Sequence, residues 1–187
     1  TQNTRAELLD AAEQLRKRGG WLIVDEAFAD ADPENSIVSF AGSDAAPNLI
    51  VLRSLGKFFG LAGARVGFIF GVPEKLDPIR EMLGPWPVSH PSRAVARAAL
   101  QDMAWQAGAR QRLATASSRL ADLLVPLGEV GRTALFCTVK TAQAAALAEH
   151  FARHAILVRH FDAHGSLRFG LPGSENEWLR LQESVGT

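Results

Sequence analysis

The stretch that decides the fold reads Ser54-Leu55-Gly56-Lys57-Phe58-Phe59-Gly60-Leu61-Ala62-Gly63-Ala64-Arg65-Val66-Gly67. It places Lys57 among aromatic and glycine residues just past the apolar run 49–52, where we expect the amine to be buried. The glycines permit tight turns or a close approach of the backbone to a ligand. Ser54 and Arg65 add a hydroxyl and a fixed cation, a pair suited to binding a phosphate.

The same stretch also fits a plainer structure, a link between two strands with a solvated Lys57 and a surface Arg65. Asp25 favours the ligand-binding interpretation, because it ends the preceding apolar run and ligands of open α/β sheets collect at the carboxyl ends of strands. A buried carboxylate there needs a cationic partner. The protonated ring nitrogen of pyridoxal phosphate would supply that partner, while Lys57 and a phosphate anchor hold other parts of the cofactor.

Apolar runs and helical patterns alternate along the first part of the chain. The runs at 21–24, 49–52 and 66–70 predict buried strands, bounded by polar or glycine residues. Helices are predicted at 4–18, with Thr4 as the cap, and at 73–82. This order of elements indicates an α/β fold with a mainly parallel sheet.

The segment Gly84-Pro85-Trp86-Pro87 reads as a stiff connector, and we expect a domain boundary there, between residues 1–84 and 85–187. A long helical region follows at 89–124, and Gly108 is a candidate break within it. Beyond this region we expect strands at 134–139, 155–160 and 166–170, a helix at 141–153 and a last helix capped by Ser174 and Glu177.

The composition argues against several classes of protein. Twenty basic and twenty acidic residues balance over the 187 positions, so nothing indicates a nucleic-acid or membrane partner. No apolar stretch is long enough to span a bilayer and no leader opens the chain, so we expect a cytoplasmic protein. The single cysteine, Cys137, is expected to be a small buried hydrophobe. The spacing of the histidines suggests no metal site.

The stretch 54–67 matches, at every defined position, the lysine-attachment signature of the class I and II aminotransferases, and 24–28 resembles the Asp-Glu-Ala-Tyr/Phe segment of their histidinol-phosphate aminotransferase branch. The resemblance implies a fold-type I architecture with pyridoxal phosphate as cofactor. Residues 1–84 would then be the carboxyl-terminal part of the large, cofactor-binding domain, and 85–187 the connecting helix and the small α/β domain. It also implies a homodimeric full-length protein.

The resemblance assigns a role to each matching position. Lys57 is similar to the lysine that forms a Schiff base with the cofactor and moves protons at the substrate's α-carbon. Asp25 resembles the partner of the pyridinium nitrogen, and Ser54 and Arg65 resemble the ligands of the cofactor phosphate. Phe28 stands where the aminotransferases usually have a tyrosine, so the hydroxyl that contacts the cofactor's phenolic oxygen is missing here.

The carboxyl-terminal strands carry the expected substrate contacts. Arg168, in Leu167-Arg168-Phe169-Gly170, resembles the arginine that holds the substrate carboxylate, and Arg159 on the neighbouring strand is a second candidate for a substrate anion. The alternative for both is an arginine at an exposed strand end. Glu26, on the opposite strand face from Asp25, is expected to form an ion pair or a cap instead of taking part in catalysis.

Within this branch, four segments are similar to the threonine-phosphate decarboxylases of cobalamin biosynthesis, at 25–28, 51–59, 84–89 and 167–172. The implied reaction is loss of CO₂ from L-threonine O-3-phosphate, a small phosphorylated amino acid; histidinol-phosphate-type transamination is the alternative. The chain begins with Thr1 and holds no Asn-Pro pair, which the family places near the cofactor. We therefore expect a carboxyl-terminal fragment that has little or no activity by itself, and a non-catalytic scaffold or dimerisation piece is the alternative from another class.

Overall fold

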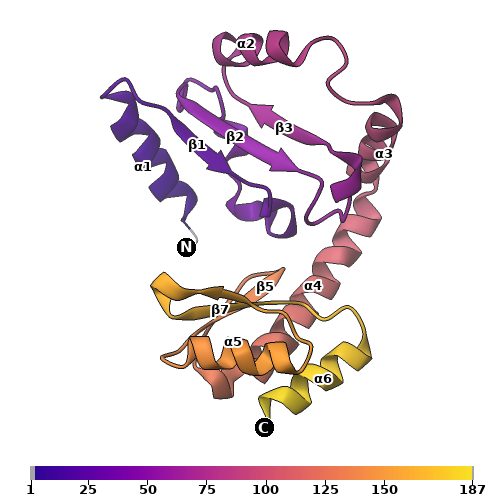
Figure 1. Cartoon of the computed structure of the whole chain (residues 1–187). Helices are drawn as coiled ribbons and strands as arrows, with labels where there is room; N and C mark the ends of the chain where they lie inside the picture. Colours follow the sequence, from indigo (N-terminus) through magenta and orange to yellow (C-terminus); the bar gives the residue numbers. More distant parts are fainter. Residues whose placement is uncertain (1–2, 187) are drawn as a thin grey trace. The chain divides into compact units, whose positions relative to one another are not determined.

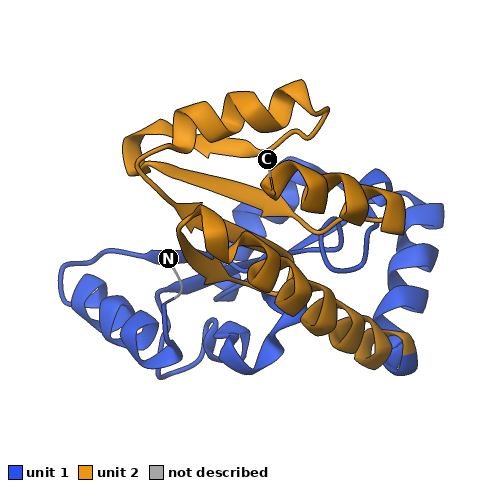
Figure 2. Cartoon of the chain, turned by 90° about the horizontal axis from the view of Figure 1, so that it is seen from below, with its two compact units in different colours: residues 1–104 blue, residues 105–187 orange. Residues whose placement is uncertain are grey.

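The computed structural model describes residues 3–186 (Figure 1). The chain forms two compact units, residues 1–104 and 105–187, each with its own sheet and its own hydrophobic core (Figure 2). The α/β fold class is confirmed. The division between the two compact units falls between Ala104 and Trp105. The boundary predicted at residues 84–85 separates the domains of the family fold, which is a different division, and it stays a prediction.

The first unit contains a three-stranded sheet in the order β1 (Leu22–Asp25), β2 (Leu49–Ser54) and β3 (Gly67–Phe70). β1 and β2 are parallel, as expected from their buried apolar runs. β3 is antiparallel to β2, which departs from the predicted direction. The reason lies in the link between them: it contains only the short 3-10 turn Ala62–Ala64 and returns the chain along β2 without crossing the sheet.

One face of this sheet packs on a core, and helix α1 (Arg5–Arg16) contributes to it. α1 begins at Thr4, whose hydroxyl accepts from the Glu7 backbone N–H at 3.3 Å, while the Glu7 carboxylate accepts from the Thr4 N–H at 2.7 Å. The buried members of the core and the side chains packed on them from the sheet and α1 are Ile37, Ala46, Leu49, Val51, Leu8, Leu9, Leu22 and Val24.

Two further helices of the first unit are α2 (Pro73–Leu83) and α3 (His90–Gln101). The long helical region predicted at 89–124 is two helices, because α3 ends at Gln101 and, after the single residue Asp102, α4 (Met103–Leu124) begins. The break therefore lies at Asp102, and Gly108 is an interior residue of α4.

The second unit has a four-stranded, fully antiparallel sheet in the order β4 (Glu129–Arg132), β5 (Phe136–Lys140), β7 (Ser166–Gly170) and β6 (Arg159–Phe161). Helices α5 (Ala144–Arg153) and α6 (Glu175–Val185) complete it, and α6 begins with the predicted capping box of Ser174 and Glu177. β4 was not predicted, because Glu129-Val130-Gly131-Arg132 has no apolar run.

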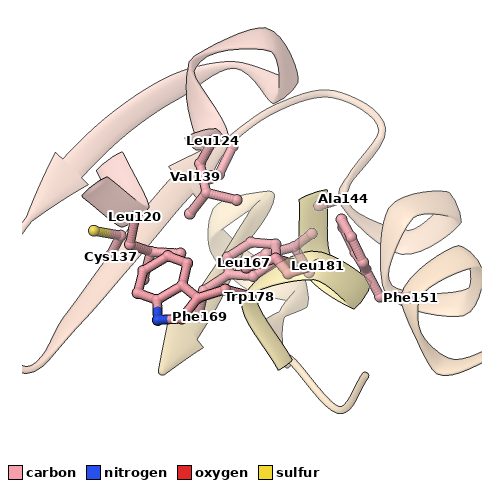
Figure 3. Close-up of a cluster of buried hydrophobic side chains, with 10 residues drawn as sticks. All are labelled: Leu120, Leu124, Cys137, Val139, Ala144, Phe151, Leu167, Phe169, Trp178 and Leu181. Carbon is pink, nitrogen blue, oxygen red and sulfur yellow. The ribbon is translucent and has the colours of Figure 1, made fainter. Parts of the chain in front are cut away.

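The core of the second unit joins α4, α5, α6 and the sheet (Figure 3). The Phe151 and Phe169 rings meet edge to face, with centroids 5.1 Å apart. Cys137 is fully buried in this core, as predicted, and its thiol donates to the Ser117 carbonyl oxygen at 3.7 Å. Burial raises the pKa of the Cys137 thiol, which keeps the side chain in its neutral form.

Within residues 3–186, no helix has both the length and the apolar character needed to cross a bilayer. The same residues contain no group of three or more His, Cys, Asp or Glu side chains placed to hold a metal ion.

Candidate functional site

The parallel pairing of β1 and β2 brings two predicted site residues to one edge of the sheet. Asp25 ends β1 opposite Leu52, and Ser54 ends β2 two residues beyond Leu52. Because opposite residues share a face and every second residue of a strand returns to it, Asp25 and Ser54 lie on the same face. The hydrophobic core that contains Ile37, Leu49 and Val51 packs on the other face. Ile23 lies on the same face as Asp25, and it is 62% exposed.

A hollow of about 240 Å³ lies beyond the carboxyl end of β2. Its lining includes Ser54, Lys57 and Arg65, so the structure brings these three predicted residues together. No carboxylate lines it, and its two charged side chains are both cationic. The hollow therefore suits an anion. Its full lining is Ser54, Gly56, Lys57, Leu61, Ala62, Arg65, Val66 and Gly67.

Ser54 is arranged as a hydrogen-bond donor. Its Oγ accepts from the Gly56 backbone N–H at 3.1 Å, which fixes the hydroxyl in the turn after β2. The hydroxyl proton makes no hydrogen bond with any residue that the structure describes, so it remains for a ligand oxygen.

Two glycines of the lining, Gly56 and Gly67, have little room for a side chain. A Cβ on Gly56 would lie 3.3 Å from Ser54 Oγ and 3.4 Å from the Ala62 Cα, and a Cβ on Gly67 would lie 3.3 Å from the Arg53 carbonyl oxygen. A side chain on Gly56 would crowd Ser54 and Ala62, which line the hollow, and a side chain on Gly67 would press on the backbone of β2. Glycine at these two positions thus permits the close packing of the chain on itself around the turn after β2.

Arg65 has an unusual backbone for a non-glycine residue. Its φ of 53° and ψ of 44° are left-handed, where an L side chain costs about 1–2 kcal/mol. Its Nη1 donates to the Ala62 carbonyl oxygen at 3.3 Å, so the guanidinium turns back over the short turn that precedes it. In the part of the chain that the structure covers, Arg65 has no carboxylate partner.

Lys57 is exposed, so the burial expected for it is wrong for this structure. The two aromatic residues that follow it, Phe58 and Phe59, are buried, whereas Lys57 and Gly60 on either side of this pair are exposed. The Lys57 Nζ lies 5.4 Å from the centroid of the Phe28 ring, a cation–π contact. This contact joins the segment after β1 to the segment after β2.

Asp25 is also exposed, so it is not the buried carboxylate that the sequence suggested. Its Oδ1 accepts from the Ala27 backbone N–H at 2.9 Å, which sets the turn that leads to Phe28. Its second carboxylate oxygen makes no hydrogen bond or ion pair with the described residues. Asp25 does not line the hollow, but it ends the neighbouring strand at the same edge.

The buried carboxylate at this edge is Glu26, and its ion pair confirms the role predicted for it. Glu26 is 7% exposed and accepts from Arg53 Nη1 at 2.9 Å. Sequence reasoning did not assign Arg53, although a charge at the end of the buried run 49–52 was a signal that a partner is needed. Arg53 also pairs with Asp30.

The two predicted substrate residues lie together in the second unit. Arg159 and Arg168 are direct cross-strand neighbours on β6 and β7. Their Cζ atoms lie 5.1 Å and 5.8 Å from the centroid of the Phe161 ring, and Arg168 also lies 4.9 Å from that of Phe136. Neither guanidinium forms an ion pair or hydrogen bond with the described residues. Two cations directly opposite each other on neighbouring strands repel, and an anionic ligand between them would offset the repulsion.

Comparison with known proteins decides the family. The model of the family described as aminotransferase class I and II matches residues 1–184. The chain belongs to the class I and II aminotransferase family. The Ser54–Gly67 stretch, on which the resemblance was based, forms the walls of the hollow.

Three relatives show how much of a full-length family member the chain covers. It is 48% identical to the threonine-phosphate decarboxylase of Pseudomonas aeruginosa and 41% identical to that of a Sinorhizobium species, over 96% of this chain and 54% of each relative. Identity to the histidinol-phosphate aminotransferase 2 of Gluconobacter oxydans is 33%, over 96% of this chain and 49% of that protein. The chain thus spans about half the length of these relatives.

Solved structures of aminotransferases share the fold. The histidinol-phosphate aminotransferase from Sinorhizobium meliloti, solved in complex with pyridoxal-5'-phosphate, matches with a TM-score of 0.80 and 23% identity, over 100% of this chain and 54% of that one. The enzyme of the same name from Clostridium acetobutylicum matches with a TM-score of 0.83 and 19% identity, over 97% and 58% of the two chains. At identities of 23% and 19%, these matches establish the shared fold.

Proposed function

We propose that this chain is the carboxyl-terminal half of a pyridoxal phosphate enzyme that decarboxylates L-threonine O-3-phosphate to aminopropanol phosphate in cobalamin biosynthesis. The observation that carries the proposal is the cationic hollow of Ser54, Lys57 and Arg65 beside Asp25, in a chain 48% identical to a threonine-phosphate decarboxylase. In the experiments below, "the whole protein" means the complete enzyme of which this chain would be the carboxyl-terminal half. A cytoplasmic location and a homodimeric whole protein belong to the same proposal.

The residues fit the cofactor by their chemistry. Ser54 and Arg65 offer a hydroxyl donor and a fixed cation to its phosphate, in a hollow where Gly56 leaves space beside the Ser54 hydroxyl. Lys57 supplies the primary amine that attaches it. When bound, pyridoxal phosphate withdraws electrons from the substrate's α-carbon.

Asp25 would hold a proton on the cofactor's ring nitrogen, since its free carboxylate oxygen is at the same edge as the hollow. Lys57 then has a second task, to return a proton to the α-carbon after CO₂ has left. Phe28 has no hydroxyl to offer the cofactor, and its ring lies under the Lys57 amine. We propose that this ring takes the place of the usual tyrosine as a wall of the site.

Substrate anions are the proposed ligands of Arg168 and Arg159. Arg168 would bind the carboxylate, and Arg159 a second anionic group, since both guanidinium groups are held against aromatic rings and lack carboxylate partners among the described residues. A planar guanidinium held in this way can fix the orientation of the substrate, and orientation selects the bond that breaks.

The reaction is tested in the whole protein by two assays run side by side. Release of CO₂ from L-threonine O-3-phosphate without 2-oxoglutarate supports the decarboxylase. Amino transfer that depends on 2-oxoglutarate supports a histidinol-phosphate-type aminotransferase, the second candidate, which the 33% identity to such an enzyme favours. Absence of both reactions supports a non-catalytic piece. We expect the 187-residue chain alone to have little or no activity, because it spans about half of its relatives.

Asp25→Asn should lower decarboxylation by about 10²-fold or more, because an amide does not hold a proton on the ring nitrogen. The substitution keeps the size of the side chain and its acceptor for the Ala27 N–H, so stability should change little. Steady-state kinetics of the whole protein measure the effect. Asp44→Asn, an exposed aspartate in the turn before β2, is the control and should leave the rate unchanged. Equal rates for Asp25→Asn and wild type would remove Asp25 from the site.

Arg65→Gly should separate backbone strain from cofactor binding. Glycine relieves the left-handed backbone at this position, so the free energy of unfolding should stay the same or rise by up to about 1 kcal/mol. Affinity for pyridoxal phosphate should nevertheless fall, because the guanidinium is lost. Ala155→Gly, at the other left-handed non-glycine residue, gives the matched control: similar relief of strain with unchanged affinity. Cofactor titration and urea denaturation give both values, and unchanged affinity in Arg65→Gly would contradict the assignment.

A further inference from the structure

A largely buried ionic network lies on the opposite face of the sheet from the hollow. At its centre, Arg53 Nη1 donates to Glu26 Oε2 at 2.9 Å and to Ser36 Oγ at 3.1 Å, and Nη2 pairs with Asp30. The side chains of Arg53, Glu26 and Asp30 are 16%, 7% and 14% exposed. Such charges are expensive to bury unless each has a partner, so the three depend on one another.

The network also fixes the backbone that follows. Glu26 Oε1 accepts from the Ile37 N–H at 2.6 Å, and Glu26 Oε2 accepts from the Ser36 hydroxyl at 2.6 Å. Ile37 is fully buried and anchors the core of the first unit. Between Glu26 and Ile37 the chain has only two short 3-10 turns and no strand, and it loops past the carboxyl end of β1 (Figure 1). Side-chain contacts therefore hold this segment in place.

Each central member of the network is the chain neighbour of a proposed site residue. Glu26 follows Asp25, and Arg53 precedes Ser54. Since successive side chains of a strand point to opposite faces, Arg53 lies on the packed face of the sheet and Ser54 on the face of the site. The Glu26 N–H also donates to the Leu52 carbonyl oxygen at 2.8 Å, so the ladder continues one residue past β1. The Arg53–Glu26 pair thus clamps the two strand ends that carry Asp25 and Ser54.

We propose that Arg53 is a positioning residue for the cofactor site: through Glu26 and Asp30 it holds the segment that carries Asp25 and Phe28 in register with the end of β2 that carries Ser54 and Lys57. This inference rests on the proposed cofactor role of those residues. Arg53 touches none of the reacting groups itself, since its guanidinium lies on the other face.

The first arm of the test needs no cofactor. Arg53→Met and Arg53→Lys are made in the whole protein, with Arg119→Met as the matched control, since Arg119 pairs with Glu175 at an exposed site. Amide hydrogen exchange is followed in the cofactor-free proteins. Arg53→Met should speed exchange within residues 26–37 by at least about tenfold, because it leaves the buried Glu26 carboxylate and the part-buried Asp30 carboxylate without their shared cation. The exchange rate of Arg53→Lys should lie between those of wild type and Arg53→Met, since a single ammonium cannot bind both carboxylates as the planar guanidinium does.

The second arm measures pyridoxal phosphate binding to the same proteins by absorbance titration. Arg53→Met should weaken binding by about tenfold or more, Arg53→Lys by less, and Arg119→Met not at all. The absorption maximum of the bound cofactor should shift in Arg53→Met in the direction that Asp25→Asn produces, because both remove a correctly placed carboxylate from the ring nitrogen. A purely structural role for Arg53 would not move this spectrum.

The outcomes separate this inference from the proposed function. Wild-type affinity and spectrum in Arg53→Met, with or without faster exchange, overturn the positioning role while the proposed function stands. A wild-type protein that does not bind pyridoxal phosphate overturns the proposed function and the inference with it. If Arg53→Met does not fold, Arg53→Lys and Asp30→Asn carry the test, because both keep a cation beside Glu26. Each should then weaken binding by at least about threefold, and unchanged binding in both overturns the proposal.

Discussion

Lys57→Ala should lower the decarboxylation rate of the whole protein by about 10³-fold or more while leaving the fold intact. The loss follows from the two tasks proposed for its amine, attachment of the cofactor and return of a proton to the α-carbon. The fold should survive because Lys57 is exposed and its Nζ contacts the Phe28 ring, whose centroid is 5.4 Å away. Exposed cation–π contacts contribute only about 0.5–1 kcal/mol.

Lys75→Ala is the matched control for Lys57→Ala. Lys75 is also exposed, and its Nζ lies 4.8 Å from the centroid of the Trp21 ring, so the same substitution removes a similar contact in the same unit. Turnover should stay within about twofold of wild type, in line with the small effect of such surface changes. If the two variants lost activity equally, the effect would come from a general loss of charge and not from the amine of Lys57.

Phe151→Ala should lower the free energy of unfolding by about 3–5 kcal/mol, the largest stability effect that we expect in the second unit. Phe151 is fully buried on α5 and packs edge to face on Phe169 (Figure 3). Its removal leaves a cavity between α5 and the sheet. Urea denaturation of the chain, followed by circular dichroism, measures the change.

Leu157→Ala serves as the control for Phe151→Ala. Leu157 lies in the same unit and is 95% exposed, so its truncation should change the free energy of unfolding by no more than about 0.5 kcal/mol. A loss below about 1 kcal/mol for Phe151→Ala would mean that the site collapses around the cavity, and that this core does not hold the unit together as described.

Much of the fold was predictable because local signals agreed with the final packing. The runs that became β1 and β2 are continuous and apolar, and the capping residues Thr4 and Ser174 begin helices α1 and α6 as predicted. Other features depend on tertiary structure. β4 is stabilised by pairing with β5 and has no apolar run, and the direction of β3 follows from the path of the link after Lys57.

The site was predictable to a similar extent. A signature of fourteen positions located Ser54, Lys57 and Arg65, and the structure places all three around one hollow. The exposure of Lys57 and Asp25 was not predictable, since a pattern of neighbours does not say which side of a turn faces solvent. The pairing of Arg53 with Glu26 was also missed, because it joins residues 27 apart in sequence and requires the parallel register of β1 and β2.

The central claim is that Lys57 is the amine that attaches pyridoxal phosphate. The most direct measurement is to incubate the whole protein with the cofactor, trap the covalent adduct with borohydride and map it by peptide mass spectrometry. The lysines that compete within this chain are Lys17, Lys75 and Lys140. We predict one adduct per protein chain, on Lys57; an adduct spread evenly over these lysines, or held by another of them, would contradict the account.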